Sequence, residues 1–241
     1  MAGEAPQYNE LAPYYDYIYS WKDYRKEAAT IERLIQKHKK SAGKALLDVG
    51  CGTGKHIQHL RHRFDCVGVD ASAPMLAVAK ENVPEVEFVE SNMLDFNLGR
   101  RFDVVLCLFS GMGYLKTRDE ARKAIFNFAE HMKDGAVLII EPWFRRSDWT
   151  KGSVHMQTYD AEGLKIARVG FSDADGEFAV ADESYLIAEE GKGTKYVRDM
   201  QRLRFFEPEW TFETMRRAGL NPRFSRETLM PGRMLTIATK R

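Results

Sequence analysis

The sequence predicts an α/β fold: an open, mostly parallel sheet covered by helices, with an antiparallel meander added to it. Up to Pro142, short apolar runs alternate with segments of helical period, and several runs are apolar throughout, as in strands buried on both faces. A glycine-rich stretch, LLDVGCGTGKH at residues 46–56, joins the first of these runs to a helix. Between residues 154 and 206 the helical period is absent, and strand-like runs are broken by DAEG, DADGE and EEGKG.

The alternation of apolar runs with segments of helical period predicts where each strand and helix lies. Strands are predicted at residues 45–49, 64–70, 86–90, 101–110 and 136–142, and two closing strands at 223–228 and 234–239. Helices are predicted at residues 22–40, 52–64, after a Ser72 cap, after the capping box Thr117–Glu120, and at 208–217. We expect one domain over residues 1–241, with a helical cap at 1–42 and an antiparallel insertion, a substrate platform, at 151–206.

Composition narrows the class of protein. The 241 residues carry 36 Lys plus Arg against 35 Asp plus Glu, a net charge of +1 without the basic excess of a nucleic-acid binder. No apolar run approaches the roughly 20 residues of a membrane span, and the N-terminus lacks a signal-peptide pattern. Cys51, Cys66 and Cys107 lack CxxC spacing, which favours reduced thiols over a disulfide or zinc site. We therefore expect a cytoplasmic enzyme with a small-molecule substrate and no membrane partner; a homodimer is one assembly that the sequence leaves open.

The polar residues at the strand ends indicate the ligand, because open parallel sheets bind ligands beyond the carboxyl ends of their strands. The first strand runs into Asp48-x-Gly50-x-Gly52-x-Gly54, and the second ends in Asp70, a carboxylate suited to ribose hydroxyls. A dinucleotide fingerprint would place glycine at position 55, where Lys55 stands. Asp48 would repel a pyrophosphate but could hold the amino group of a methionine moiety. The pattern therefore favours S-adenosylmethionine over NAD.

These motifs resemble the class I S-adenosylmethionine-dependent methyltransferases, over LLDVGCGTG, VGVDAS–PML, FVESNMLDF and RFDVVLCLFSGMGYL. Within that class the chain is most similar to the N-methyltransferases that dimethylate nucleotide-linked 3-amino sugars. The similarity includes YYDYIY, FAEHMKDGAVLIIEPW, LRFFEPEWTFETMRRAGL and PGRML. The resemblance implies a seven-stranded Rossmann-like sheet. The sequence departs from the family at FRRSDW and TLMPGRM, in the region expected to meet the sugar.

The resemblance also implies roles for individual residues. Gly50, Cys51, Gly52 and Gly54 are implied to line the methionine end, Asp70 and Met75 the ribose and adenine, and Asn92 and Met93 the adenine, with a backbone contact from Leu108. The other cofactor-binding residues that we expect are Asp48, His56 and Ala71. Tyr15 is expected to close over the methyl donor, and Tyr114 to face the acceptor amine. Arg145, Arg146 and Arg233 are expected to bind substrate, with Arg233 as the first candidate for a phosphate.

Two further inferences concern the chemistry. His56, His59 and His62 step three apart without a carboxylate, so we expect no metal site. The absence of an obvious acid–base dyad favours N-methylation of a small amine, and the resemblance implies that this amine belongs to a nucleotide-linked amino sugar. Three alternatives stay open: methylation of another N- or O-acceptor, aminopropyl transfer by the same fold, and a cofactor-binding protein without catalysis.

Overall fold

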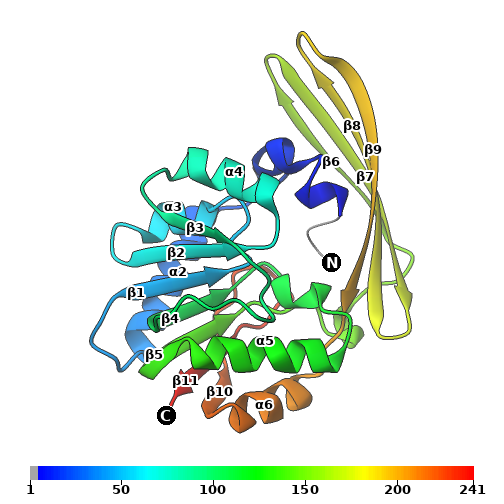
Figure 1. Ribbon diagram of the computed structural model, residues 1–241. Coiled ribbons are helices and arrows are strands. Elements are labelled where there is room, and N and C mark those ends of the chain that lie inside the picture. The colour runs from blue at the N-terminus through cyan, green and yellow to red at the C-terminus, as the bar shows by residue number, and fades with distance from the viewer. Residues whose placement is uncertain (1–4) are drawn as a thin grey trace.

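The computed structural model describes residues 5–241, and a seven-stranded sheet forms its centre (Figure 1). The strand order is β10-β11-β5-β4-β1-β2-β3, in which β1 to β5 run parallel and β11 runs antiparallel to both of its neighbours. The strands are β1 (Ala45–Val49), β2 (Asp65–Asp70), β3 (Glu87–Glu90), β4 (Phe102–Cys107), β5 (Met132–Ile140), β10 (Leu220–Phe224) and β11 (Thr236–Lys240). This arrangement confirms the predicted fold class.

Helices cover both faces of the sheet because the strand residues that point to either face are apolar. Leu46 and Val104 pack under α2 (Tyr24–His38), while Leu47 and Val105 pack on the opposite face under α5 (Arg118–Glu130). The remaining helices are α1 (Tyr15–Ile18), α3 (Lys55–Leu60), α4 (Ala73–Asn82) and α6 (Pro208–Arg217), with 3₁₀ turns η2 (Pro6–Tyr8), η3 (Ala12–Tyr14), η4 (Gly111–Tyr114) and η5 (Arg146–Asp148).

A second, four-stranded antiparallel sheet stands beside the first (Figure 1). Its strands follow in sequence order: β6 (Val154–Ala161), β7 (Leu164–Asp175), β8 (Phe178–Glu189) and β9 (Gly193–Arg204). The turns between them fall at the glycine-containing breaks in the sequence. The N-terminal segment from η2 to α1 lies between this sheet and α4, so it covers the carboxyl ends of the parallel strands (Figure 1).

One boundary error concerns the strand predicted at residues 223–228. The strand is β10, which begins three residues earlier at Leu220 and ends at Phe224. Pro222 discourages a strand in a sequence-based prediction because it lacks a backbone donor. It is tolerated here because β10 is an edge strand that pairs only with β11.

Candidate active site

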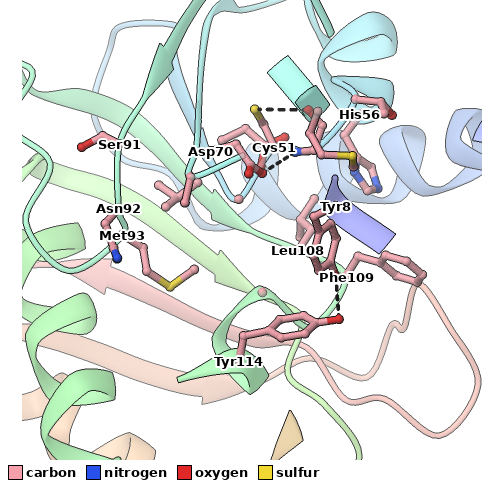
Figure 2. A pocket seen from close by; sticks show the side chains of 18 of the residues that line it. Tyr8, Cys51, His56, Asp70, Ser91, Asn92, Met93, Leu108, Phe109 and Tyr114 are labelled. Atoms are coloured by element: carbon pink, nitrogen blue, oxygen red, sulfur yellow. Dashed lines mark hydrogen bonds between the residues drawn. The ribbon is translucent and has the colours of Figure 1, made fainter. Parts of the chain in front are cut away.

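The glycine turn after β1 forms one wall of a cavity at the carboxyl ends of β1, β2 and β4 (Figure 2). Thirteen of the predicted site residues line it: Tyr15, Asp48, Gly50, Cys51, Gly52, His56, Asp70, Ala71, Met75, Asn92, Met93, Leu108 and Tyr114. The sheet thus brings together residues that are up to 99 positions apart in the chain, from Tyr15 to Tyr114.

Asp48, at the end of β1, has a buried carboxylate with no partner. Its side chain is 1% exposed, and neither Oδ1 nor Oδ2 has a hydrogen-bond partner. Burial raises the pKa of Asp48 to about 6, with Asp70 adding to the shift and His56 opposing it. A buried carboxylate without donors is costly unless a cation completes it. The site therefore fits the ammonium group of a methionine moiety.

Asp70, at the end of β2, is held in a fixed orientation. One carboxylate oxygen accepts the Gly52 N–H at 2.8 Å and the other accepts the Ser72 N–H at 2.9 Å. Burial raises the pKa of Asp70, against the stabilising effect of these N–H groups. Each carboxylate oxygen can accept a further hydrogen bond, so the group is preorganised for the two hydroxyls of a ribose.

The turn itself needs glycine. Gly50 and Gly52 have φ of +72° and +55°, and a Cβ atom at Gly52 would lie 3.3 Å from Met75 Cε. These positions expose backbone to the cavity, which lets a ligand approach the main chain. Asn92 and Met93, which follow β3, complete the cavity wall (Figure 2). The donor set and the glycine turn together fit S-adenosylmethionine.

Tyr8 and Tyr114 meet at the opposite side of the cavity (Figure 2). Their hydroxyl oxygens are 2.6 Å apart, and their rings pack edge to face at 5.3 Å between centroids. The Tyr15 ring lies beside Tyr8 at 6.2 Å. Burial raises the pKa of the Tyr15 and Tyr114 phenols, so neither is a phenolate near neutral pH.

His56 contacts a buried carboxylate that the sequence did not reveal. Its Nε2 lies 2.8 Å from Glu27 Oε2, and Glu27 is also paired with Lys22. The Lys22 ammonium lies between the rings of Tyr24 and Phe109, 4.8 and 4.7 Å from their centroids. This buried triad fixes the ring of His56 at the cavity wall.

Four predicted residues lie outside this cavity. Gly54, at the start of α3, faces Phe88 and Ala79 instead. Arg145 lines a second cavity on the other side of η4, with Trp143, Phe206 and Phe224 among its neighbours, and Arg146 is exposed at the entrance to η5. Their predicted roles in binding substrate stay predictions.

Arg233 is buried beside the loop that follows β4. Its guanidinium lies 4.5 Å from the Trp143 ring centroid, and Nη1 donates to Ser110 Oγ at 2.8 Å. Phe109 and Ser110 have the unusual φ values of +47° and +69°. Glu141 accepts the Phe109 N–H at 2.8 Å and helps to hold this strained backbone in place. The structure thus gives Arg233 a supporting contact to the cavity wall.

Within residues 5–241 we find no group of three or more His, Cys, Asp and Glu side chains arranged to hold a metal ion. The three cysteines are free thiols, and burial raises the pKa of each. In the same residues, no helix is long and apolar enough to cross a membrane.

Comparison with known proteins agrees with this geometry. A methyltransferase-domain family model matches residues 46–135. A dTDP-3-amino-3,6-dideoxy-alpha-D-glucopyranose N,N-dimethyltransferase from Streptomyces fradiae is 36% identical over 96% of this chain and 90% of its own length. DesVI from Streptomyces venezuelae superposes with a TM-score of 0.85 at 32% identity, over 91% of this chain and 93% of its own. S-adenosylmethionine-bound CalS10, an amino pentose methyltransferase from Micromonospora echinaspora, gives 0.82 at 31% identity, over 91% and 92%.

The sheet order and the cavity define a class I S-adenosylmethionine-dependent methyltransferase. Within that class, the chain belongs to the family of N,N-dimethyltransferases of dTDP-linked amino sugars.

Proposed function

We propose that this enzyme methylates the amine of a dTDP-linked amino sugar, twice on the same nitrogen. The observation that supports it is the cavity itself, which combines the partnerless Asp48 carboxylate with a wall of tyrosine hydroxyls. The cofactor supplies an already activated methyl group on a sulfonium. What remains for the protein is to hold a neutral amine against it, because proximity and orientation supply most of such an acceleration.

Residues on one wall of the cavity bind the cofactor, and residues on the other wall orient the amine. Asp48 and Asp70 hold the cofactor by its ammonium and ribose ends, and Asn92 and Met93 hold its base. Tyr15 excludes water from the cofactor side, since it is 6% exposed and lines the cavity. Tyr114 directs the amine. No side chain needs to act as an acid or a general base.

The nucleotide portion would need cations and aromatic surfaces, which the second cavity provides. Arg145 is half-buried there and lies 5.4 Å from the Phe224 ring centroid, so its guanidinium is preorganised. Because Arg233 is 5% exposed and already bound to Ser110, we propose Arg145 rather than Arg233 as the first contact for a phosphate.

We also propose a homodimer that forms through the outer face of the four-stranded sheet. This face exposes seven large apolar side chains: Val154, Met156, Val169, Phe171, Leu186, Tyr196 and Met200. It also carries the ion pair of Asp182 and Arg198, so both signs of charge are available to a second copy. An isologous interface needs such self-complementarity.

The net charge of +1 and the free thiols support a cytoplasmic enzyme without a nucleic-acid partner.

The test is methyl transfer with nucleotide-linked 3- and 4-amino sugars, the matching free amino sugars, and simple amines and alcohols, read by mass spectrometry. We expect mono- and then dimethylated nucleotide sugar. Arg145→Ala should raise KM for the nucleotide-linked sugar at least tenfold and leave KM for the free sugar unchanged. Arg217→Ala, at an exposed position on α6, is the control and should change neither KM. Cofactor binding accompanied by methylation of only a simple amine or an alcohol would overturn the proposal.

A further inference from the structure

Tyr114 is the end of a buried hydrogen-bonded chain that runs away from the cavity into the four-stranded sheet. Its hydroxyl lies 2.7 Å from Gln201 Oε1, on β9. Gln201 Nε2 in turn lies 2.7 Å from Asp199 Oδ2 and 2.6 Å from Gln7 Oε1. Gln201 and Asp199 are 8% and 0% exposed, so water does not compete for these bonds.

Burial raises the pKa of Asp199, and in its ionised form this group sets the direction of the hydrogen bonds from Gln201 to Tyr114. A carboxylate only accepts, so the side of the Gln201 amide that faces it must be the NH₂ group. The amide oxygen therefore faces Tyr114, and the Tyr114 hydroxyl must donate its single hydrogen to it. Because that hydrogen is used, the 2.6 Å contact with Tyr8 requires the Tyr8 hydroxyl to be the donor.

We propose that Asp199 and Gln201 are positioning residues which leave one lone pair of Tyr114 free to accept an N–H of the substrate amine. A hydroxyl oxygen has two lone pairs, of which one accepts from Tyr8 and one remains. Both phenol hydrogens are used in hydrogen bonds within the protein, so neither is available to the amine. The amine thus donates an N–H to the Tyr114 oxygen. Its own lone pair accepts no hydrogen bond and can point toward the methyl donor.

The inference rests on the proposed function, since it needs an amine acceptor beside Tyr114. It adds a prediction about the second methyl transfer. A neutral primary amine has two N–H bonds that can meet Tyr114, but a neutral monomethylated amine has one. The second transfer should therefore depend more strongly on the orientation of the Tyr114 hydroxyl.

Asp199→Asn tests the proposal, because the shape is kept while residue 199 gains a donor that lets the Gln201 amide turn over. Tyr114 could then direct its hydrogen into the cavity, toward the amine lone pair. We expect kcat to fall several-fold, up to the loss in Tyr114→Phe, with monomethylated product accumulating. The Kd of the acceptor, measured calorimetrically with S-adenosylhomocysteine present, should stay within twofold. In a Tyr114→Phe background, Asp199→Asn should have no further effect on kcat.

Glu183→Gln is the matched control, because Glu183 pairs with Asp199 across the strands and is 6% exposed, but contacts His155 and Arg168 instead. It should lower the Tm at least as much and leave the ratio of mono- to dimethylated product unchanged. Wild-type product ratio and kcat in Asp199→Asn, or independent losses in the double variant, would overturn the inference. A wild-type enzyme inactive on all amino sugars would instead overturn the proposed function.

Discussion

At the residue scale, Asp48 illustrates how a group can be unfavourable for folding and favourable for binding. Burial without a partner raises its pKa to about 6. Between its unfolded pKa near 4 and about 6, the folded chain binds more protons at this group than the unfolded chain. Its contribution to stability is therefore lost as the pH rises toward 6, and a bound ammonium reverses the effect.

The pH dependence of cofactor binding tests this description of Asp48. We expect the affinity for S-adenosylmethionine to weaken below about pH 6, because only the carboxylate pairs with the ammonium. Asp48→Asn should bind at least tenfold more weakly at pH 8 and show no such dependence, by calorimetry. Its Tm without cofactor at pH 8 should be no lower than that of the wild type. A pH dependence that persists in Asp48→Asn would assign the titration to another group.

The tyrosines should contribute by position rather than by proton transfer. Since burial raises the pKa of Tyr15 and Tyr114, neither phenol is a base near neutral pH. We expect Tyr15→Phe and Tyr114→Phe to cost about tenfold or less in kcat, below the 10²–10⁴ typical of a general base. Tyr15→Ala should cost more because it opens the cofactor side to water. A thousandfold loss in Tyr114→Phe, with a pH profile that does not change with the acceptor, would indicate an enzymatic base.

At the scale of elements, the N-terminal segment is attached to the cofactor-binding loop by one carboxylate. Asp16, in α1, accepts from Thr53 Oγ1 at 2.6 Å and from Asn82 Nδ2 at 3.0 Å. These bonds join α1 to the glycine turn and to the end of α4. They hold Tyr15 over the cavity.

Asp16→Asn should weaken this attachment, because one of its two side-chain acceptors becomes a donor. We expect the cofactor dissociation rate, followed by stopped-flow fluorescence, to rise about three- to tenfold with little change in the association rate. Asp119→Asn on α5, whose ion pairs are at the surface, is the control and should change neither rate. Equal dissociation rates in the two variants would mean that α1 does not hold the cofactor in place.

Elements differ in how far the sequence can predict them. The parallel strands and Asp48, Gly50 and Asp70 could be predicted, because each apolar run ends in a polar residue whose place in such a sheet is fixed by topology. The Tyr114–Gln201–Asp199 chain could not, since it joins the turn η4 to strand β9 of the second sheet, 87 positions away in the sequence. In the sequence of β9, these polar residues cannot be told apart from the other alternating positions of a strand. Tyr8 was missed for the same reason: only the folded chain brings it to Tyr114.

At the scale of the whole molecule, the exposed apolar face of the four-stranded sheet predicts the assembly. We expect size-exclusion chromatography with light scattering to give the mass of two chains. Leu186→Arg should yield monomers, because Leu186 is 52% exposed on that face, and a buried unpaired charge in an interface is costly. Phe126→Arg, an exposed residue on α5, is the control and should leave the dimer intact. A monomeric wild type would contradict the proposal.

The position of the N-terminal segment has a consequence for the order of events in a double methylation. Gln7 contacts Gln201, and Tyr8 both lines the cavity and bonds to Tyr114, so this segment belongs to the cofactor wall and the acceptor wall at once. If spent cofactor leaves by displacing the segment, the same motion breaks the contacts that orient the amine. The monomethylated sugar is then released each time the cofactor is exchanged, and we expect a distributive enzyme. In a time course, the concentration of free monomethylated sugar should rise before it falls. Added unlabelled acceptor should compete with this intermediate for the enzyme and slow its second methylation.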